Sequence, residues 1–220
     1  MTKFTQTFVR ITGWLVYKIV FRTRIFYEDK EEQGRKIKGG AILISNHTAL
    51  YDYAQMLFLF PGRILRYVMA EIIMDRKILG KFLKCMGGIR VDRDAHDFSF
   101  LYKCEEILDK GGVVGIFPEG RLPRPGEEPP LEFKPSAAYI ALRSGAPIIP
   151  VYTDGKYFVK GHANVIIGKK LYAEELTDLT KSEKEQIEEI SIALREKILE
   201  LKNELEQQQK GSEKQEMATV

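Results

Sequence analysis

Several short apolar runs, each followed by polar residues or a turn, constrain the fold most strongly. Residues 41–45 (AILIS), 113–117 (VVGIF) and 148–152 (IIPVY) are typical of buried strands. Further strands are predicted at 66–70, 89–91 and 164–167, and helices at 51–60, 77–86, 98–108 and 135–143. This alternation predicts an α/β fold, with a mostly buried mixed β-sheet flanked by helices.

The first residues combine a helical apolar face with positive charge, because residues 1–24 hold five bases and no acid. One face of the helical wheel carries Phe4, Phe8, Ile11, Leu15 and Ile19, and the other carries Lys3, Thr7, Arg10 and Lys18. This favours a membrane-associating segment, 1–27, whose amphipathic helix lies in the interface on anionic lipid. An ordinary helix packed on its own domain is the alternative. No uncharged run approaches the ~18–20 residues of a spanning helix.

A long C-terminal helix is predicted for residues 181–209. Ser182 and Glu185 form a capping box at its start. Apolar residues then recur at steps of three and four, at Ile187, Ile190, Leu194, Ile198, Leu201 and Leu205. This stripe covers the body of the protein or pairs with a partner, and the first is favoured. Residues 28–180 then form one α/β domain, and residues 210–220 a flexible tail.

Composition limits the class of protein. Hydrophobic residues make up 44% and charged residues 30% of the 220 residues, which excludes a disordered chain and a polytopic membrane protein. Two cysteines, Cys85 and Cys104, exclude a disulfide scaffold and a Cys-rich zinc module. Because residues 174–220 hold 13 acids and 7 bases, the net charge of +3 conceals a basic body that can face phosphates.

The strongest chemical signal is the segment Asn46-His47-Thr48-Ala49-Leu50-Tyr51-Asp52. His47 and Asp52 stand where a strand ends and a helix begins, the usual place for sites in α/β proteins. A carboxylate bonded to one imidazole nitrogen fixes the tautomer and leaves the other nitrogen as a base. For this spacing alone, a helix-capping histidine beside an unrelated aspartate is the commoner explanation.

A second polar cluster, Phe117-Pro118-Glu119-Gly120-Arg121, also follows a predicted strand. Glu119 and Arg121 suit a polar, charged substrate, and Gly120 permits a close approach of the backbone. A turn with a structural ion pair is the alternative explanation for this cluster.

Two more segments lie at predicted strands. Arg90 and Arg93 stand near a strand end, where an arginine can bind a phosphate through two hydrogen bonds. Alternatively, Arg93 only pairs with Asp92 or Asp94. Residues 148–151 (IIPV) form an apolar strand whose simplest role is core packing.

In this order, the four elements resemble the motifs of the glycerolipid acyltransferase family, which includes 1-acylglycerol-3-phosphate acyltransferases. The resemblance covers residues 40–152, and its first and third blocks together are highly specific. Asn46, His47 and Asp52 match the family's first block, N-H-x4-D, and Gly87, Ile89, Val91 and Arg93 match its second, G-x-I-x-I-x-R. Phe117, Pro118, Glu119 and Gly120 match the start of the third block, F-P-E-G-T-R-S. Ile149, Pro150 and Val151 match the fourth, V-P-V. After Gly120 the usual Thr-Arg-Ser is replaced by Arg121-Leu122-Pro123, so that Arg121 or Arg124 takes the place of the family's arginine.

The resemblance implies a catalytic domain at 28–180 that transfers a fatty acyl group from acyl-CoA or acyl-carrier-protein to the sn-2 hydroxyl of 1-acylglycerol-3-phosphate, which gives phosphatidic acid. It implies His47 as general base oriented by Asp52, with Arg93 on the acceptor phosphate. Glu119, Gly120 and Arg121 would shape the acceptor site. No cofactor is expected beyond the thioester co-substrate.

The expected partners are a lysophospholipid acceptor, an acyl thioester donor and an anionic membrane surface, with acyl-carrier-protein as a partner if it carries the donor. The expected location is peripheral, on the cytoplasmic face of the cytoplasmic membrane. Two alternatives remain open. One is an acyltransferase for another lysophospholipid or hydroxyl acceptor, and the other is a non-catalytic lipid-surface binding protein.

Other chemistries lack their motifs in this sequence. There is no G-x-S-x-G elbow, and neither cysteine is near the histidine motif. His96 and His162 lack metal-ligand spacing to His47, so that no metal is expected. No P-loop or Rossmann glycine fingerprint occurs. Nucleic-acid binding would rest on net charge alone and is not expected.

Overall fold

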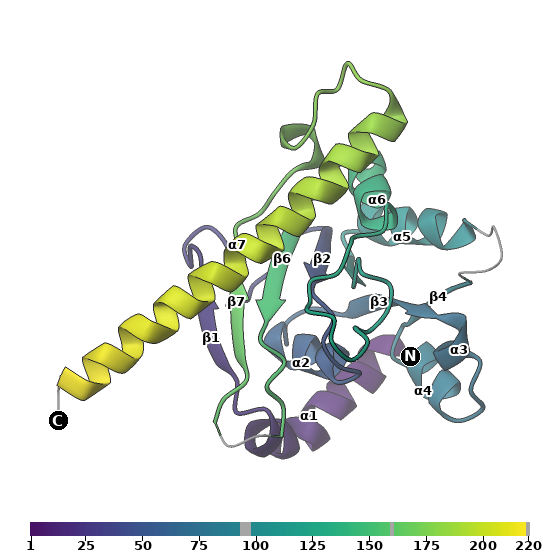
Figure 1. Cartoon of the computed structure of the whole chain (residues 1–220). Coiled ribbons are helices and arrows are strands. Elements are labelled where there is room, and N and C mark those ends of the chain that lie inside the picture. The colour runs from purple at the N-terminus through teal and green to yellow at the C-terminus, as the bar shows by residue number, and fades with distance from the viewer. Residues whose placement is uncertain (93–97, 159–160, 219–220) are drawn as a thin grey trace.

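The structure, a computed structural model, describes residues 1–92, 98–158 and 161–218. Within these residues seven strands form one mixed sheet in the order β1-β7-β6-β2-β5-β3-β4 (Figure 1). Strands β2 to β6 are parallel to one another, and β7 runs antiparallel to β6. The strands are β1 (Arg24–Tyr27), β2 (Ala41–Ser45), β3 (Leu65–Ala70), β4 (Ile89–Val91), β5 (Val113–Ile116), β6 (Ile148–Thr153) and β7 (Asn164–Ile167).

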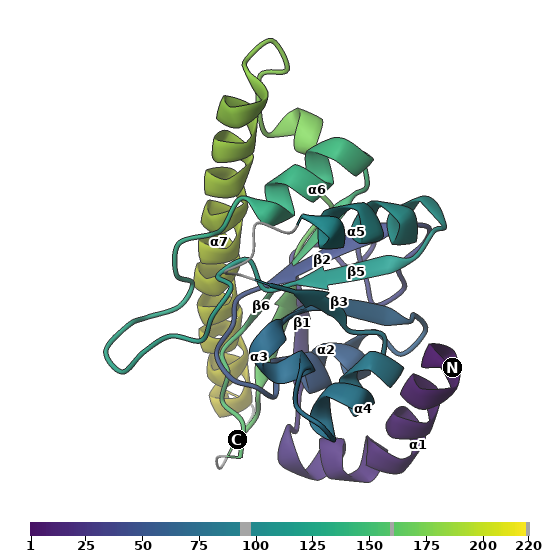
Figure 2. The same ribbon diagram turned by 90° about the vertical axis from the view of Figure 1, so that its right-hand side faces the viewer.

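Helices cover both faces of the sheet, so that the molecule has three layers (Figure 2). Helices α5, α6 and α7 lie on one face, and α1 to α4 lie on the other. The helices are α1 (Thr2–Val20), α2 (Asp52–Leu59), α3 (Glu71–Met74), α4 (Leu79–Cys85), α5 (Ser99–Asp109), α6 (Ser136–Ser144) and α7 (Glu183–Ala218), with a short 3-10 helix η1 (Ala173–Glu175). The predicted α/β fold with a mixed sheet, an N-terminal helix and a long C-terminal helix is confirmed.

The burial of the central strand β2 on both faces explains why its sequence does not alternate between apolar and polar residues. Ile42 and Ile44 belong to the core cluster under α5, α6 and α7, whereas Ala41 and Leu43 belong to the cluster under α2. All four side chains are fully buried, because the strand is covered on both faces. The neighbouring strands β5 and β6 are buried in the same way.

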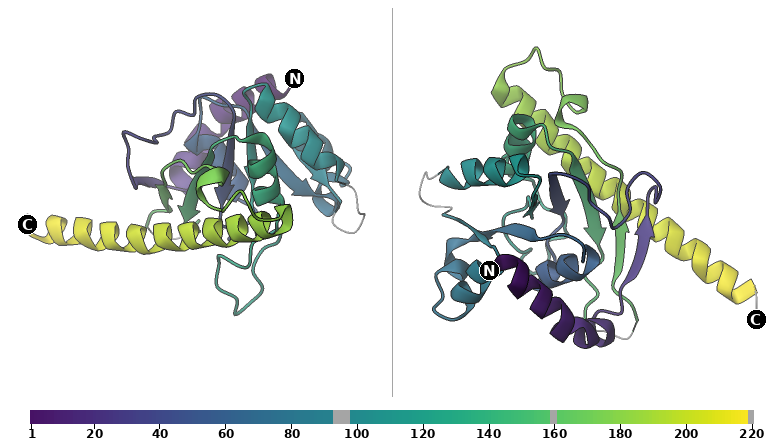
Figure 3. Two further views of the ribbon diagram at one scale, coloured as in Figure 1. Left: turned by 90° about the horizontal axis from the view of Figure 1, so that it is seen from above. Right: turned by 180° about the vertical axis from the view of Figure 1, so that it is seen from behind.

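The apolar stripe of α7 packs on the sheet and on α6 rather than on a partner. Its residues Ile190, Leu194, Ile198, Leu201 and Leu205 are all buried. The helix continues through Ala218, beyond the predicted end at residue 209, and its last turns extend past the sheet (Figure 3). The division of the chain into segments at 27, 180 and 209 stays a prediction.

Strand β1 was not predicted, because residues 24–27 were expected to belong to the membrane-associating segment. These four residues form the edge of the sheet and pair in parallel with β7, with Ile25 opposite Val165. Their identity as a strand depends on this partner, which lies about 140 positions away in the sequence.

Helix α1 turns the face with Gln6, Arg10 and Tyr17 toward the protein and its apolar face toward the exterior. The side chain of Gln6 is fully buried, and its amide bonds to the backbone of Leu65 and Met86. Arg10 donates to the carbonyl oxygens of Leu57, Phe60 and Arg63, near the end of α2. The exposed side chains on the opposite face are Phe4, Phe8, Ile11, Leu15, Val16 and Ile19. The helix therefore does not pack on its domain through its apolar face.

We expect Gln6→Ala to lower the free energy of unfolding by about 2 kcal/mol or more, because it leaves the N–H and C=O of Leu65 and the C=O of Met86 buried without partners. Chemical denaturation followed by circular dichroism measures this change. Thr7→Ala, at an exposed neighbouring position, is the control and should change stability by less than about 0.5 kcal/mol. Equal stability of the two variants would contradict a stabilising role for the hydrogen bonds of Gln6.

Candidate active site

Three parallel strands bring the predicted motifs to one edge of the sheet. In the register, Ile44 of β2 lies beside Ile116 of β5, and Ser45 lies beside Val151 of β6. The carboxyl ends of these strands therefore coincide, and the segments that follow β2 and β5 carry His47 and Glu119. This is the edge where α/β proteins usually place their sites.

His47 and Asp52 are in direct contact. His47 Nδ1 lies 2.8 Å from Asp52 Oδ2, although the residues are five positions apart. The contact forms because the chain turns sharply between β2 and α2, and the Asp52 carboxylate stands at the first residue of α2. A carboxylate only accepts hydrogen bonds, so Nδ1 carries the proton and the lone pair of neutral imidazole lies on Nε2.

The Asp52 carboxylate is fully buried and accepts five hydrogen bonds from the described residues. Oδ2 accepts from His47 Nδ1 and from the backbone N–H groups of Thr48, at 2.6 Å, and Ala49, at 2.9 Å. Oδ1 accepts from Thr48 Oγ1 at 2.9 Å and from the Tyr157 hydroxyl at 2.6 Å. These donors compensate for the loss of water around a buried charge. The carboxylate is thereby held in one orientation toward the imidazole.

The imidazole of His47 is also held from its face. Its ring stacks on Phe117, with the centroids 4.2 Å apart and the planes inclined by 8°. The side chain is 17% exposed, and among the described residues no hydrogen-bond partner lies on Nε2. The ring is thus fixed on one edge and one face, while Nε2 is available to a substrate.

Glu119 holds two backbone segments of the site together through hydrogen bonds. Its Oε1 accepts the N–H of His47 at 2.7 Å, and its Oε2 accepts the N–H of Leu131 at 2.8 Å. Burial raises the pKa of Glu119, while the two N–H donors lower it in part. Both oxygens face the protein, so Glu119 joins the segment after β2 to the segment after the 121–130 loop. Its predicted contact with substrate stays a prediction.

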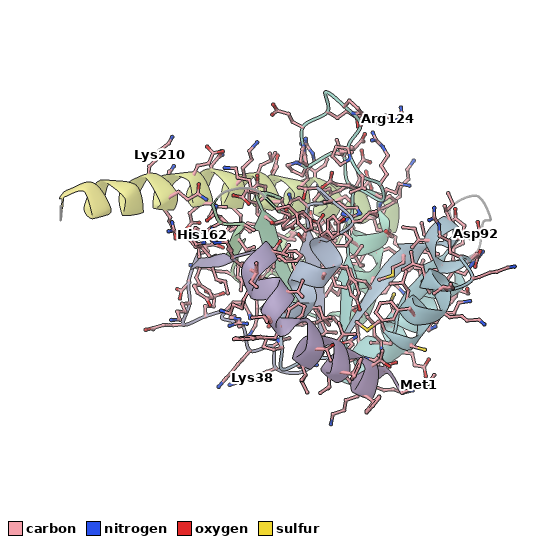
Figure 4. All side chains as sticks on the ribbon, turned by 90° about the horizontal axis from the view of Figure 1, so that it is seen from below. Met1, Lys38, Asp92, Arg124, His162 and Lys210 are labelled. Carbon is pink, nitrogen blue, oxygen red and sulfur yellow. The ribbon has the colours of Figure 1, made fainter. Side chains whose placement is uncertain are left out.

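The next two motif residues shape the turn after Glu119. Gly120 has φ +68°, a backbone conformation that favours glycine, and a Cβ there would also displace the end of the flexible Lys134 side chain, which lies 2.8 Å away. Arg121 forms two hydrogen bonds with Glu127, at 2.6 and 2.9 Å. Arg124 lies at the outer end of the 121–130 loop (Figure 4). Arg121 is therefore nearer than Arg124 to the backbone that Glu119 holds, but its guanidinium is already hydrogen-bonded to Glu127.

The predicted phosphate ligand, Arg93, lies outside the described residues. Its neighbour Arg90 is bonded to Asp75 at 2.9 Å and to Asp92 at 3.3 Å. His96 also lies outside the described residues, and His162 is half-buried, with Nδ1 bonded to the carbonyl of Arg22. No group of three His, Cys, Asp or Glu side chains that could hold a metal occurs in the described part of the chain.

Sequence reasoning did not identify Tyr157, Gln55 or Thr153 as part of the site. Tyr157 bonds to Asp52, and Gln55 and Thr153 lie against the same hydroxyl. No motif marks Tyr157, which follows β6 and is 105 positions from Asp52. Phe117 belongs to a recognised motif, but its stacking on His47 required the tertiary structure.

The fold and the site define the class of protein: an α/β enzyme whose histidine is equipped for acid–base chemistry. A family model described as Acyltransferase matches residues 24–154. The chain belongs to this family and is an acyltransferase. Within the described residues, no helix is long and apolar enough to cross a membrane.

Curated relatives and a solved structure are similar over most of the chain. A 1-acyl-sn-glycerol-3-phosphate acyltransferase of Bacillus subtilis is 30% identical over 76% of this chain and 84% of its own length. The chloroplastic enzyme LPAT1 of Arabidopsis thaliana is 26% identical over 68% of this chain, which spans only 44% of that longer protein. The crystal structure of the lysophosphatidic acid acyltransferase PlsC from Thermotoga maritima has the same fold, with a TM-score of 0.65, 20% identity and coverage of 91% and 81%.

Proposed function

We propose that the protein transfers a fatty acyl group from an acyl thioester to the sn-2 hydroxyl of 1-acylglycerol-3-phosphate, with phosphatidic acid as product. The observation that carries this proposal is the His47–Asp52 pair with Nε2 available at the carboxyl edge of the sheet. The names of the Bacillus subtilis and Arabidopsis thaliana relatives support this choice of acceptor.

The residues fit the reaction without a cofactor. Nε2 of His47 takes the proton of the acceptor hydroxyl as its oxygen attacks the thioester carbonyl. The carbon–sulfur bond of the resulting tetrahedral intermediate then breaks, and the imidazolium returns its proton to the thiolate. Asp52 stabilises the imidazolium between these steps. Because the thioester is already activated, no covalent enzyme intermediate is needed.

The exposed apolar face of α1 supports a peripheral position on the membrane. Seven large apolar side chains of α1, including Trp14, are more than half exposed, and the segment 1–24 carries five bases and no acid. Helix α4 and its N-cap add exposed Ile78 and Phe82 beside Lys77 and Lys81. Apolar groups among bases suit an anionic bilayer surface, where the lipid acceptor resides. We place this surface on the cytoplasmic side of the cytoplasmic membrane.

The direct test is acceptor-dependent thiol release. The purified protein is mixed with lysophosphatidic acid in anionic vesicles and with a C16 acyl-CoA or, separately, the acyl-carrier-protein thioester. Release of thiol with formation of phosphatidic acid supports the proposal and identifies the donor. Release only with a different lysophospholipid would move the assignment to a sibling acyltransferase. Vesicle binding without release from either donor would favour a non-catalytic lipid-binding protein.

Arg93 tests the nature of the acceptor. We expect Arg93→Ala to raise the KM for lysophosphatidic acid at least ~10-fold while kcat changes less, because an arginine–phosphate hydrogen-bonded pair contributes about 1.5–3 kcal/mol. Arg90→Ala is the matched control, since Arg90 is already bonded to Asp75 and Asp92. An ordinary KM in the Arg93 variant would remove this residue from the phosphate site.

A further inference from the structure

Tyr157 connects the reaction centre with the end of α1. It lies in the segment after β6, and its ring is buried in a small core cluster with Tyr17, Phe21 and Ala163. The ring of Phe21, the residue that caps α1, lies 5.1 Å from that of Tyr157. The tyrosine ring is therefore held by packing that does not involve the catalytic pair.

The hydroxyl of Tyr157 points at the catalytic carboxylate. It lies 2.6 Å from Asp52 Oδ1 and also contacts Gln55 Oε1 and Thr153 Oγ1. A phenol has one proton, and the buried carboxylate is the strongest acceptor among these groups, so the proton is donated to Asp52. Burial and the charge of Asp52 raise the pKa of Tyr157, which keeps the hydroxyl protonated as a donor.

The two oxygens of Asp52 are held differently. Oδ2 is fixed by two backbone N–H groups besides His47. Among the described residues, Oδ1 accepts only from hydroxyls, those of Thr48 and Tyr157. Thr48 belongs to the same turn as Asp52, whereas Tyr157 belongs to a separate packed cluster. The rotation of the carboxylate plane, and with it the hydrogen bond to His47, therefore depends on Tyr157.

We propose that Tyr157 is a positioning residue for the His47–Asp52 pair, which it anchors to the cluster at the end of α1. This inference rests on the proposed function for its kinetic part. Tyr157 lies beyond the residues matched by the family model, which end at 154, so the family match does not include this tyrosine.

The kinetic test is Tyr157→Phe, which removes the hydroxyl and keeps the ring. We expect kcat for acyl transfer to fall about 10-fold, with both KM values within threefold, because a hydrogen bond to the charged carboxylate is lost. Tyr152→Phe is the control. Tyr152 is a buried tyrosine of β6 whose ring belongs to the core on the other face of the sheet, and its variant should keep kcat within twofold.

A double-mutant cycle separates positioning from a general structural role. If Tyr157 acts through Asp52, Tyr157→Phe should change kcat by less than twofold in an Asp52→Asn background. A further 10-fold loss in that background would overturn the proposal, and so would an unchanged kcat in the single variant.

A readout without substrate keeps this inference separate from the proposed function. Nitrogen NMR of the histidines, with His47 assigned by its absence in His47→Ala, reports the share of imidazole protonated on Nδ1. We expect a high share in the wild type and a smaller share in Tyr157→Phe. If the wild type transfers no acyl group, the proposed function fails while this spectrum still decides the role of Tyr157. Identical spectra would contradict it.

Discussion

Replacing His47 by alanine is expected to lower kcat for acyl transfer at least ~100-fold, because general-base catalysis typically contributes 10²–10⁴-fold. The hydroxyl of the acceptor is a poor nucleophile at neutral pH, and Nε2 is the available base at this edge of the sheet. The side chain is partly exposed, and its hydrogen-bonded partner Asp52 keeps four other donors. We therefore expect the His47→Ala protein to fold with a melting temperature close to that of the wild type.

The measurement is initial-rate thiol release with saturating donor and acceptor, with circular dichroism of both proteins. His162→Ala is the matched control, since the half-buried His162 ring is bonded to the carbonyl of Arg22 and lies in the segment before β7. Its kcat should stay within twofold of the wild type. A His47→Ala protein with wild-type kcat would exclude His47 as the base, and equal losses in both variants would indicate a general effect on folding.

Replacing two apolar residues on the outer face of α1 is expected to weaken binding to anionic vesicles about 30-fold. Ile11 and Leu15 are 73% and 61% exposed, so Ile11→Ser with Leu15→Ser should leave the body of the protein intact. Full burial of such a side chain contributes about 1.5–3 kcal/mol. With partial insertion we take about 1 kcal/mol for each residue, and 1.4 kcal/mol corresponds to a tenfold change in affinity.

The control removes the same residue types elsewhere. Leu179 and Ile192 are 58% and 54% exposed and lie in or near the start of α7, at the opposite end of the molecule from α1 (Figure 1). Leu179→Ser with Ile192→Ser should change vesicle binding less than threefold in a sedimentation assay. Equal binding by both double variants would disprove anchoring through α1. Deletion of residues 1–22 is a poorer test, because it also removes Gln6 and Arg10 from the body.

Most of the fold followed from local patterns. The apolar runs of β2, β5 and β6 gave the central strands within a residue or two, because a strand covered on both faces needs consecutive apolar residues. The helices α2, α5 and α6 followed from periodicity and from the glycines and prolines around them. Strand β1 was not predicted, because its four residues form a strand only when β7 lies beside them.

The candidate site was predicted in part. His47 and Asp52 were paired correctly, since five positions of chain across a strand–turn–helix junction bring them together. The role of Glu119 in shaping the acceptor site stays a prediction, and the structure adds that its two oxygens accept backbone N–H groups. The fixed position of Asp52 also depends on Tyr157, for which the sequence carries no spacing signal.

The sequence by itself determined the α/β class, the central strands, the His47–Asp52 pair and the resemblance to the acyltransferase family. These features depend on short-range periodicity and on motifs within a few residues of a strand end. Only the tertiary structure decided which side of α1 faces outward. An apolar stripe suits a protein core and a bilayer equally well, and the choice was made by Gln6 and Arg10, whose buried partners lie more than forty residues away. The contact of Tyr157 with Asp52 has the same origin, because it joins two segments that meet only when the sheet is assembled.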